Sequence, residues 1–296
     1  MKDTFSNYHP VVNMLYFTVV LIFAMFFTHP VCLVISFVCA FIYSIYLNGK
    51  KTLKFSLVFM LPMLIITALI NPLFNHQGGT ILAYLPTGNP LTLESVLSGI
   101  NAALMLIAVI SWFSCFNKIM TSDKFVYLFG RVIPALSLIL SMSLRLVPRF
   151  QTQIKIISNA QKCVGQNVSN GSLLQKMKHG IKILSIMVTW ALENAIETAD
   201  SMKSRGYGLP GRTTFSIFKF QKRDFYALIY IFACGIYIFT GALSGGLYFR
   251  YFPTVEGILT EPYTFTLFFV YLALCIMPLI INIQEDVKWA VLQSKT

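Results

Sequence analysis

Six long apolar runs divide this chain of 296 residues, and polar, basic or glycine-rich segments separate them. The runs cover residues 11–28, 31–47, 55–71, 93–115, 225–246 and 264–284. A helix that crosses a bilayer needs about 20 mostly apolar residues, and each run approaches or reaches that length. The pattern therefore predicts an all-α, polytopic membrane protein with about six transmembrane helices.

The composition agrees with this interpretation. Apolar residues make up 56% of the chain and charged residues only 11%, and the mean hydropathy is +0.69. Soluble domains carry about 25% charged residues. The net charge of +12 could indicate a nucleic-acid partner, but the basic residues lie between apolar runs, so we expect no nucleic acid. The six cysteines show no C-x-x-C spacing and are expected to be buried thiols, not disulfides or metal ligands.

The charges of the loops predict the orientation in the membrane. The loop at 48–54 contains three lysines, whereas the loop at 72–92 contains no lysine or arginine. Basic loops stay on the cytoplasmic side, so we expect 48–54 inside and 72–92 outside. Both termini and the basic connection at 117–131 are then cytoplasmic.

The segment between the fourth and fifth runs, residues 132–223, has a different character. It carries 13 lysines and arginines against three acidic residues. Mixed apolar and charged positions at helical spacing predict two amphipathic helices, at about 149–165 and 172–206. The short apolar stretch 132–147 is expected to lie at the inner membrane interface or among the other helices. The chain then divides into transmembrane helices at 1–131, a cytoplasmic or interfacial segment at 132–223, and transmembrane helices at 224–296.

The two amphipathic helices are predicted to end in similar sequences. The first ends in AQKCVG (160–165) and the second in SMKSRG (201–206). Gly206 stands where a left-handed residue ends a helix, and Gly208, Pro210 and Gly211 prevent a restart. A basic residue at a helix C-terminus offsets the helix dipole, so Arg205 alone could be an ordinary cap. The repetition instead indicates two similar partners, or one partner dimer.

Several motifs, in order along the chain, resemble the transmembrane (T) component of energy-coupling factor transporters, a branch of the ATP-driven importers. They are HPVVNML (9–15), NPLFNHQGGT (71–80), LTLESVLSGI (91–100), LRLVPRF (144–150) and the two helix ends. The resemblance covers nearly the whole chain. It implies a membrane subunit of a vitamin or micronutrient importer, located in the plasma membrane of a prokaryotic cell.

The same resemblance implies the partners. The family's T component binds two cytoplasmic ATPases through its two coupling-helix ends, and it holds a small membrane-embedded substrate-binding (S) component. ATP and Mg²⁺ belong to the ATPases, so this chain is expected to bind no cofactor and to catalyse no reaction. Its task would be to transmit ATPase motion to the S component.

The two helix ends occupy the places of the family's two Ala-Arg-Gly motifs. Ser204, Arg205 and Gly206 match the second motif, with serine in place of alanine. The first end, Ala160, Gln161, Lys162, Cys163, Val164 and Gly165, departs from the pattern, because Val164 stands at the arginine position and Cys163 at the alanine position. We expect this end to dock mainly by apolar packing, with Lys162 supplying some charge.

Arg145 and Pro148 belong to the motif that leads into the first coupling helix. An arginine inside an apolar stretch is costly and is usually paired or close to water. Arg145 therefore has two interpretations: it anchors the start of the coupling segment, or it extends to lipid phosphates.

Other functional classes find less support in the sequence. It contains no phosphate-binding G-x-x-x-x-G-K-[ST] motif and no H-E-x-x-H zinc motif. A catalytic metal is therefore not expected. A membrane-embedded enzyme or a self-sufficient permease remains the alternative to a transport subunit.

Overall fold

Helices form most of the chain in the computed structural model, which describes residues 3–84, 89–165, 172–207, 218–257 and 261–293. The chain divides into two compact units. The first, called the membrane unit, comprises residues 1–124 and 218–296, and the second, called the inserted unit, comprises residues 125–217.

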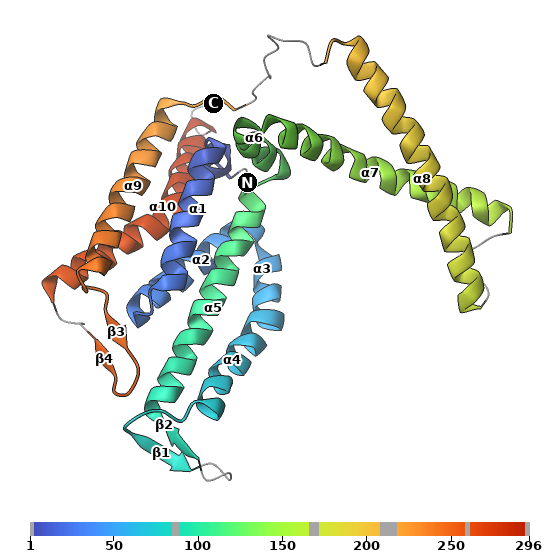
Figure 1. Cartoon of the computed structure of the whole chain (residues 1–296). Coiled ribbons are helices and arrows are strands. Elements are labelled where there is room, and N and C mark those ends of the chain that lie inside the picture. Colours follow the sequence, from blue (N-terminus) through green and yellow to red (C-terminus); the bar gives the residue numbers. More distant parts are fainter. Residues whose placement is uncertain (1–2, 85–88, 166–171, 208–217, 258–260, 294–296) are drawn as a thin grey trace. The chain divides into compact units, whose positions relative to one another are not determined.

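The membrane unit contains all six predicted apolar helices (Figure 1). They are α1 (Pro10–Phe26), α2 (Pro30–Asn48), α3 (Lys50–Phe55) continuing through a π-helical turn (Ser56–Met60) into α4 (Leu61–Phe74), α5 (Leu93–Ile119), α9 (Lys222–Leu243) and α10 (Pro262–Gln293). Five of the helical runs are long and apolar enough to cross a membrane, and α1 is apolar but shorter, with 17 residues. The predicted all-α, polytopic fold is confirmed.

A His-Pro pair starts each of the first two membrane helices. The Nδ1 atom of His9 accepts a hydrogen bond from the N–H of Val11 at the start of α1, at 3.3 Å. His29 does the same for Val31 at the start of α2, also at 3.3 Å. Proline follows as the first helical residue, where its fixed φ suits a helix and its missing N–H costs nothing. The two side chains thus cap helix ends that would otherwise expose unpaired donors.

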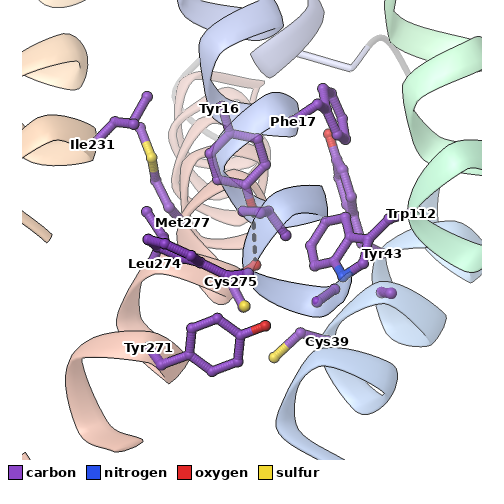
Figure 2. Close-up of a cluster of buried hydrophobic side chains, with 14 of the residues drawn as sticks. Tyr16, Phe17, Cys39, Tyr43, Trp112, Ile231, Tyr271, Leu274, Cys275 and Met277 are labelled. Carbon is purple, nitrogen blue, oxygen red and sulfur yellow. Dashed lines mark hydrogen bonds between the residues drawn. The ribbon is translucent and has the colours of Figure 1, made fainter. Parts of the chain in front are cut away.

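Aromatic side chains and a few buried polar contacts hold the membrane helices together (Figure 2). The hydroxyl of Tyr16 on α1 donates to the carbonyl of Cys275 on α10 at 3.1 Å. The indole of Trp112 on α5 donates to Ser36 on α2 at 2.9 Å. Membrane helices associate through packing and such hydrogen bonds, because lipid is as apolar as their surfaces. All six cysteines are free thiols, and four of them are buried.

Two short antiparallel hairpins join membrane helices. The loop at 72–92, which is expected outside, contains β1 (Ile81–Tyr84) and β2 (Pro90–Thr92). The second hairpin, β3 (Phe249–Arg250) with β4 (Glu256–Gly257), lies between α9 and α10.

A buried carboxylate fixes the first hairpin on the start of α5. Glu94 is 3% exposed and accepts from the N–H and the hydroxyl of Thr80, the latter at 2.8 Å. A Cβ atom at Gly78 would lie 2.5 Å from the Glu94 carboxylate, so this close approach requires glycine.

The inserted unit contains most of α6 (Ser122–Val132) together with α7 (Pro134–Cys163) and α8 (Leu173–Ser204). The basic connection at 117–131 is mostly helical, since α5 continues to Ile119 and α6 begins at Ser122. One predicted helix boundary was wrong. The apolar stretch 132–147 and the helix expected from residue 149 form one continuous helix, α7, with Pro148 inside it. A proline removes one helical hydrogen bond, but the turns on both sides keep their own, so the helix continues.

Candidate functional site

The helices α7 and α8 cross each other near their middles (Figure 1). The guanidinium of Arg149 on α7 lies 5.5 Å from the ring centre of Trp190 on α8 and donates to the Asn194 side chain at 2.8 Å. Phe150 packs edge-on against Trp190, with ring centres 5.7 Å apart. A cation over an indole, an aromatic pair and a charge-assisted hydrogen bond therefore fix the crossing point.

Sequence reasoning did not identify these crossing residues. A signal was present, because an arginine and an aromatic residue follow Pro148 directly, and Trp190 and Asn194 lie one helical turn apart on the same face of α8. Local spacing could not show which residues of α7 would contact Trp190 and Asn194.

The end of α8 has a complete glycine cap. Arg205 is the C-cap residue, with φ −82° and ψ 7°, and Gly206 follows with φ 73°. The N–H of Gly206 donates to the carbonyl of Lys203 at 2.9 Å, and the N–H of Tyr207 donates to that of Met202 at 3.0 Å. This pair of bonds is the Schellman pattern, in which a left-handed glycine satisfies the last helical carbonyls.

The end of α7 has the same geometry in its described part. Val164 is the C-cap residue, with φ −89° and ψ 13°, and Gly165 follows with φ 77°. The N–H of Gly165 donates to the carbonyl of Lys162 at 3.0 Å. Val164 and Arg205 therefore occupy equivalent backbone positions, and the two ends, called the first and second tips, differ in side chain and not in backbone conformation.

The structure places the predicted site residues as follows. Ala160, Gln161, Lys162, Val164 and Gly165 lie in the last turn and cap of α7, and Ser204, Arg205 and Gly206 lie in those of α8. The tips are not brought together: each lies roughly 20 Å along its helix from the crossing, at 1.5 Å per residue. Gly208, Pro210 and Gly211 lie outside the described residues.

The two tips offer different chemistry. Val164 is 71% exposed at the first tip. Arg205 is exposed at the second tip, where the hydroxyl of Ser204 already donates to the carbonyl of Ser201 at 2.9 Å. The second tip therefore exposes a planar cation, whereas the first exposes an apolar side chain beside Lys162.

Arg145 and Pro148 lie within α7, near the crossing rather than at a tip. Arg145 is exposed and stands one helical turn before Arg149. Pro148 directly precedes Arg149, and its carbonyl accepts from the hydroxyl of Thr152 at 3.1 Å. Both residues belong to the part of α7 that leads to the crossing.

One face of α8 carries an exposed row of apolar side chains, called the apolar stripe. Its members are Leu173, Leu174, Met177, Ile181, Leu184, Val188, Leu192 and Ile196. From Leu174 onward they are spaced three or four residues apart, and Leu173 adjoins Leu174, so they lie along one side of the helix. Trp190, which packs on α7, is two positions from Val188 and from Leu192, so the stripe and the crossing lie on different faces.

These features define a class of protein: a multi-pass helical membrane protein with a unit of two crossing, similarly capped helices inserted between α5 and α9. Comparison with known sequences gives the family. The sequence model of the cobalt transport protein family matches residues 2–217, and the chain belongs to this family, the T components of energy-coupling factor transporters. The helices α9 and α10 lie outside the matched range.

Curated relatives agree with this assignment. The energy-coupling factor transporter transmembrane protein EcfT of Streptococcus equi is 29% identical over 212 residues, which cover 67% of this chain and 74% of the relative. The protein of the same name from Staphylococcus aureus is 28% identical over 215 residues, covering 67% and 75%. The one from Lactococcus lactis is 41% identical over a shorter stretch of 90 residues, covering 30% and 34%.

Proposed function

We propose that this chain is the coupling subunit of an ATP-driven importer of the energy-coupling factor type. It transmits the motion of two ATPase subunits to a membrane-embedded S component and catalyses no reaction itself. The observation that carries the proposal is the pair of tips: two helices that cross at a fixed point end in the same glycine-capped backbone conformation. Two tips with the same backbone conformation can each bind one of two similar ATPase subunits.

Each tip docks one ATP-binding subunit. At the second tip, the guanidinium of Arg205 binds a carboxylate or helix-end carbonyls in a groove of the ATPase, because its planar fork can form paired bonds. At the first tip, Val164 packs against an apolar part of the equivalent groove. ATP and Mg²⁺ bind in these partners, and this chain supplies no nucleotide site.

The apolar stripe of α8 supports the proposed contact with the S component. A continuous row of exposed apolar side chains marks a surface that contacts another protein or a membrane. We assign this face to the S component, a small membrane protein with apolar helices of its own. The S component selects the substrate, a vitamin or another micronutrient, and the rest of the chain's apolar surface faces the lipid bilayer.

The proposal also fixes an orientation. The tips face the cytoplasm, where the ATPases are, and the basic loop at 48–54 and both termini lie on the same side. The loop at 72–92 then faces the outside, in agreement with its lack of lysine and arginine.

The test is co-purification of the tagged chain from native membranes, followed by mass spectrometry. Wild-type chain is expected to recover two ATP-binding subunits and a small membrane protein. Arg205→Glu reverses the charge at the second tip and is expected to recover less of the ATPases but as much of the small membrane protein, since breaking one partner of a buried charge pair costs about 2–5 kcal/mol. Lys178→Glu is the matched control, because it reverses an exposed charge on α8 far from the tip.

The outcomes separate the alternatives. Equal recovery of ATPases by wild type and Arg205→Glu would reduce Arg205 to a helix cap. Wild-type chain that is recovered alone would refute the coupling role and favour a membrane-embedded enzyme or a self-sufficient permease.

A further inference from the structure

Residues 3–9 form a strap across one end of the membrane unit. This N-terminal strap contains a 3-10 turn at Phe5–Asn7 that precedes α1. The Phe5 ring is fully buried and packs against Tyr16 and Phe17 of α1, with ring centres 5.3 and 6.3 Å away. The strap is therefore held in the core of the unit and is not a loose terminus.

The strap is bound to α10 through one side chain. The N–H of Phe5 donates to the side-chain oxygen of Asn282 at 3.0 Å, and the amide nitrogen of Asn282 donates to the carboxylate of Asp3. Asn282 is 1% exposed, and its amide satisfies a donor and an acceptor of the strap at the same time.

Lys124, in the first turn of α6, binds the strap from a second side. Its ammonium group donates to the carbonyl of Ser6 at 2.6 Å and to that of Ile119, the last residue of α5, at 2.9 Å. The Asn13 amide, oriented so that its nitrogen donates to the Phe5 carbonyl, presents its oxygen to the same ammonium group at 2.9 Å. Lys124 is 4% exposed, and a lysine is so deeply buried only when oxygen atoms replace its water.

The start of α9 binds the strap from a third side. The guanidinium of Arg223 donates to the carbonyl of Asn7 at 2.9 Å and lies 4.9 Å from the ring centre of Tyr8. The carboxylate of Asp224, which is 1% exposed, accepts from the N–H of His9 at 3.2 Å.

These contacts lie directly beside the two points where the chain enters and leaves the inserted unit. Lys124 is the last residue before the inserted unit, which begins at residue 125 and ends at residue 217. Arg223 and Asp224 follow its end by a few residues, and Phe220, between them and the inserted unit, packs edge-on against His9 at 5.3 Å. The N-terminal strap therefore contacts the chain just before the inserted unit and just after it. Through Asn282 the strap also links both of these points to α10.

We propose that the N-terminal strap is a clasp that fixes the two connections of the inserted unit to each other and to α10. Without it, each connection could bend separately, and motion of the inserted unit would be lost at the two joints. With it, both joints move together with α10. This mechanical consequence rests on the proposed coupling function, whereas the clasp itself is a property of the free chain.

The first experiment tests the clasp in the purified full-length chain by amide hydrogen exchange. Lys124→Met removes the contacts on the α6 side only. We expect exchange to become about tenfold faster or more not only at residues 119–126 but also at 218–226, because hydrogen bonds to a charged group are among the stronger ones and their loss opens the segment they close. Lys118→Met is the matched control: it removes an exposed lysine from the last turn of α5 and should leave both segments unchanged.

A second variant, on the α9 side, keeps the test decisive if Lys124→Met does not fold. Arg223→Met removes the contacts on the α9 side, and the Arg223 side chain is 40% exposed, so the loss is easier to tolerate. Faster exchange is then expected at 119–126 as well as at 218–226, with Lys222→Met as its control. Exchange that rises only next to each substituted residue, in both variants, would overturn the proposal.

The second experiment tests the consequence in the assembled complex. With the ATPases bound, addition of ATP should change amide exchange in α10 around Asn282 in the wild type, and this response should be lost in Lys124→Met although the ATPases still co-purify. If the wild-type chain binds no ATPases, the proposed function fails, but the exchange experiment on the free chain still decides whether the clasp exists. If the ATPases bind and α10 responds equally in Lys124→Met, the mechanical role is refuted.

Discussion

The first tip provides the sharpest test of how the proposed ATPase partners would dock, because its valine could act in two opposite ways. Val164 has the same backbone conformation as Arg205 and is 71% exposed. If it packs into an apolar groove, Val164→Ala removes about two carbon groups worth about 0.8 kcal/mol each, scaled by the exposed fraction. The loss is then about 1 kcal/mol, or about fivefold in affinity. Val164→Arg should also weaken binding, because it places a charge in an apolar site.

The assay is the Kd of the purified ATPase subunits for the full-length chain in lipid nanodiscs. Val188→Ala is the matched control, since Val188 is a half-exposed valine of α8 far from either tip. Lys162→Ala should weaken binding slightly, as an exposed charge contributes up to about 1 kcal/mol. Tighter binding by Val164→Arg, together with no effect of Lys162→Ala, would refute apolar docking and make Val164 a weakened arginine site.

Three further predictions follow from the structure. Gly206→Ala should destabilise the end of α8 by about 1 kcal/mol, because alanine resists a φ of 73°, and amide exchange in the last helical turn should become faster. Arg149→Ala and Trp190→Ala should show a coupling energy of about 0.5–1 kcal/mol in a double-mutant cycle of thermal unfolding, since the guanidinium lies over the indole. Burial lowers the pKa of Lys124 from 10.5 to about 8, and the carboxylate of Asp3 offsets only part of this shift. The unfolded chain therefore binds more protons between about pH 8 and 10.5, so the contribution of Lys124 to the unfolding free energy should rise with pH in that window.

Each of these predictions has a contrasting variant. Gly180→Ala, inside α8 and with no atom near its Cβ position, should stabilise the helix by about 1 kcal/mol instead. Additive effects of Arg149→Ala and Trp190→Ala would contradict an energetic contact at the crossing. Lys124→Met should remove the rise of stability with pH, and an unchanged slope would assign it to another group.

The membrane helices could be predicted because lipid imposes a simple rule. A spanning helix must be apolar for about 20 residues, so each run is visible in the sequence without knowledge of its neighbours. The second tip could be predicted for a similar reason: the left-handed conformation of Gly206 is local and strongly selects glycine. Local rules therefore identified the membrane helices and the second cap.

The contacts that organise these elements could not be predicted, because they join distant parts of the chain. Asn282 binds Phe5, and Arg149 binds Asn194, and neither pair has a spacing that local periodicity could reveal. The continuity of α7 through Pro148 was also missed, since a proline usually ends a helix and only the turns around it decide otherwise.

The crossing of α7 and α8 determines what the two tips can do together. Each tip lies roughly 20 Å from the crossing along its own helix, so the pair forms a lever with arms of similar length about one contact. That contact includes the Arg149 guanidinium near the Trp190 ring, the hydrogen bond from Arg149 to Asn194 and the edge-on packing of Phe150 against Trp190. Because these interactions gather around the Trp190 ring, we expect them to resist sliding along the helices more than a change of the crossing angle. If the two proposed ATPases move toward each other, we therefore expect the angle between α7 and α8 to change while the contact at Trp190 stays in place, and the apolar stripe on α8 to turn with its helix.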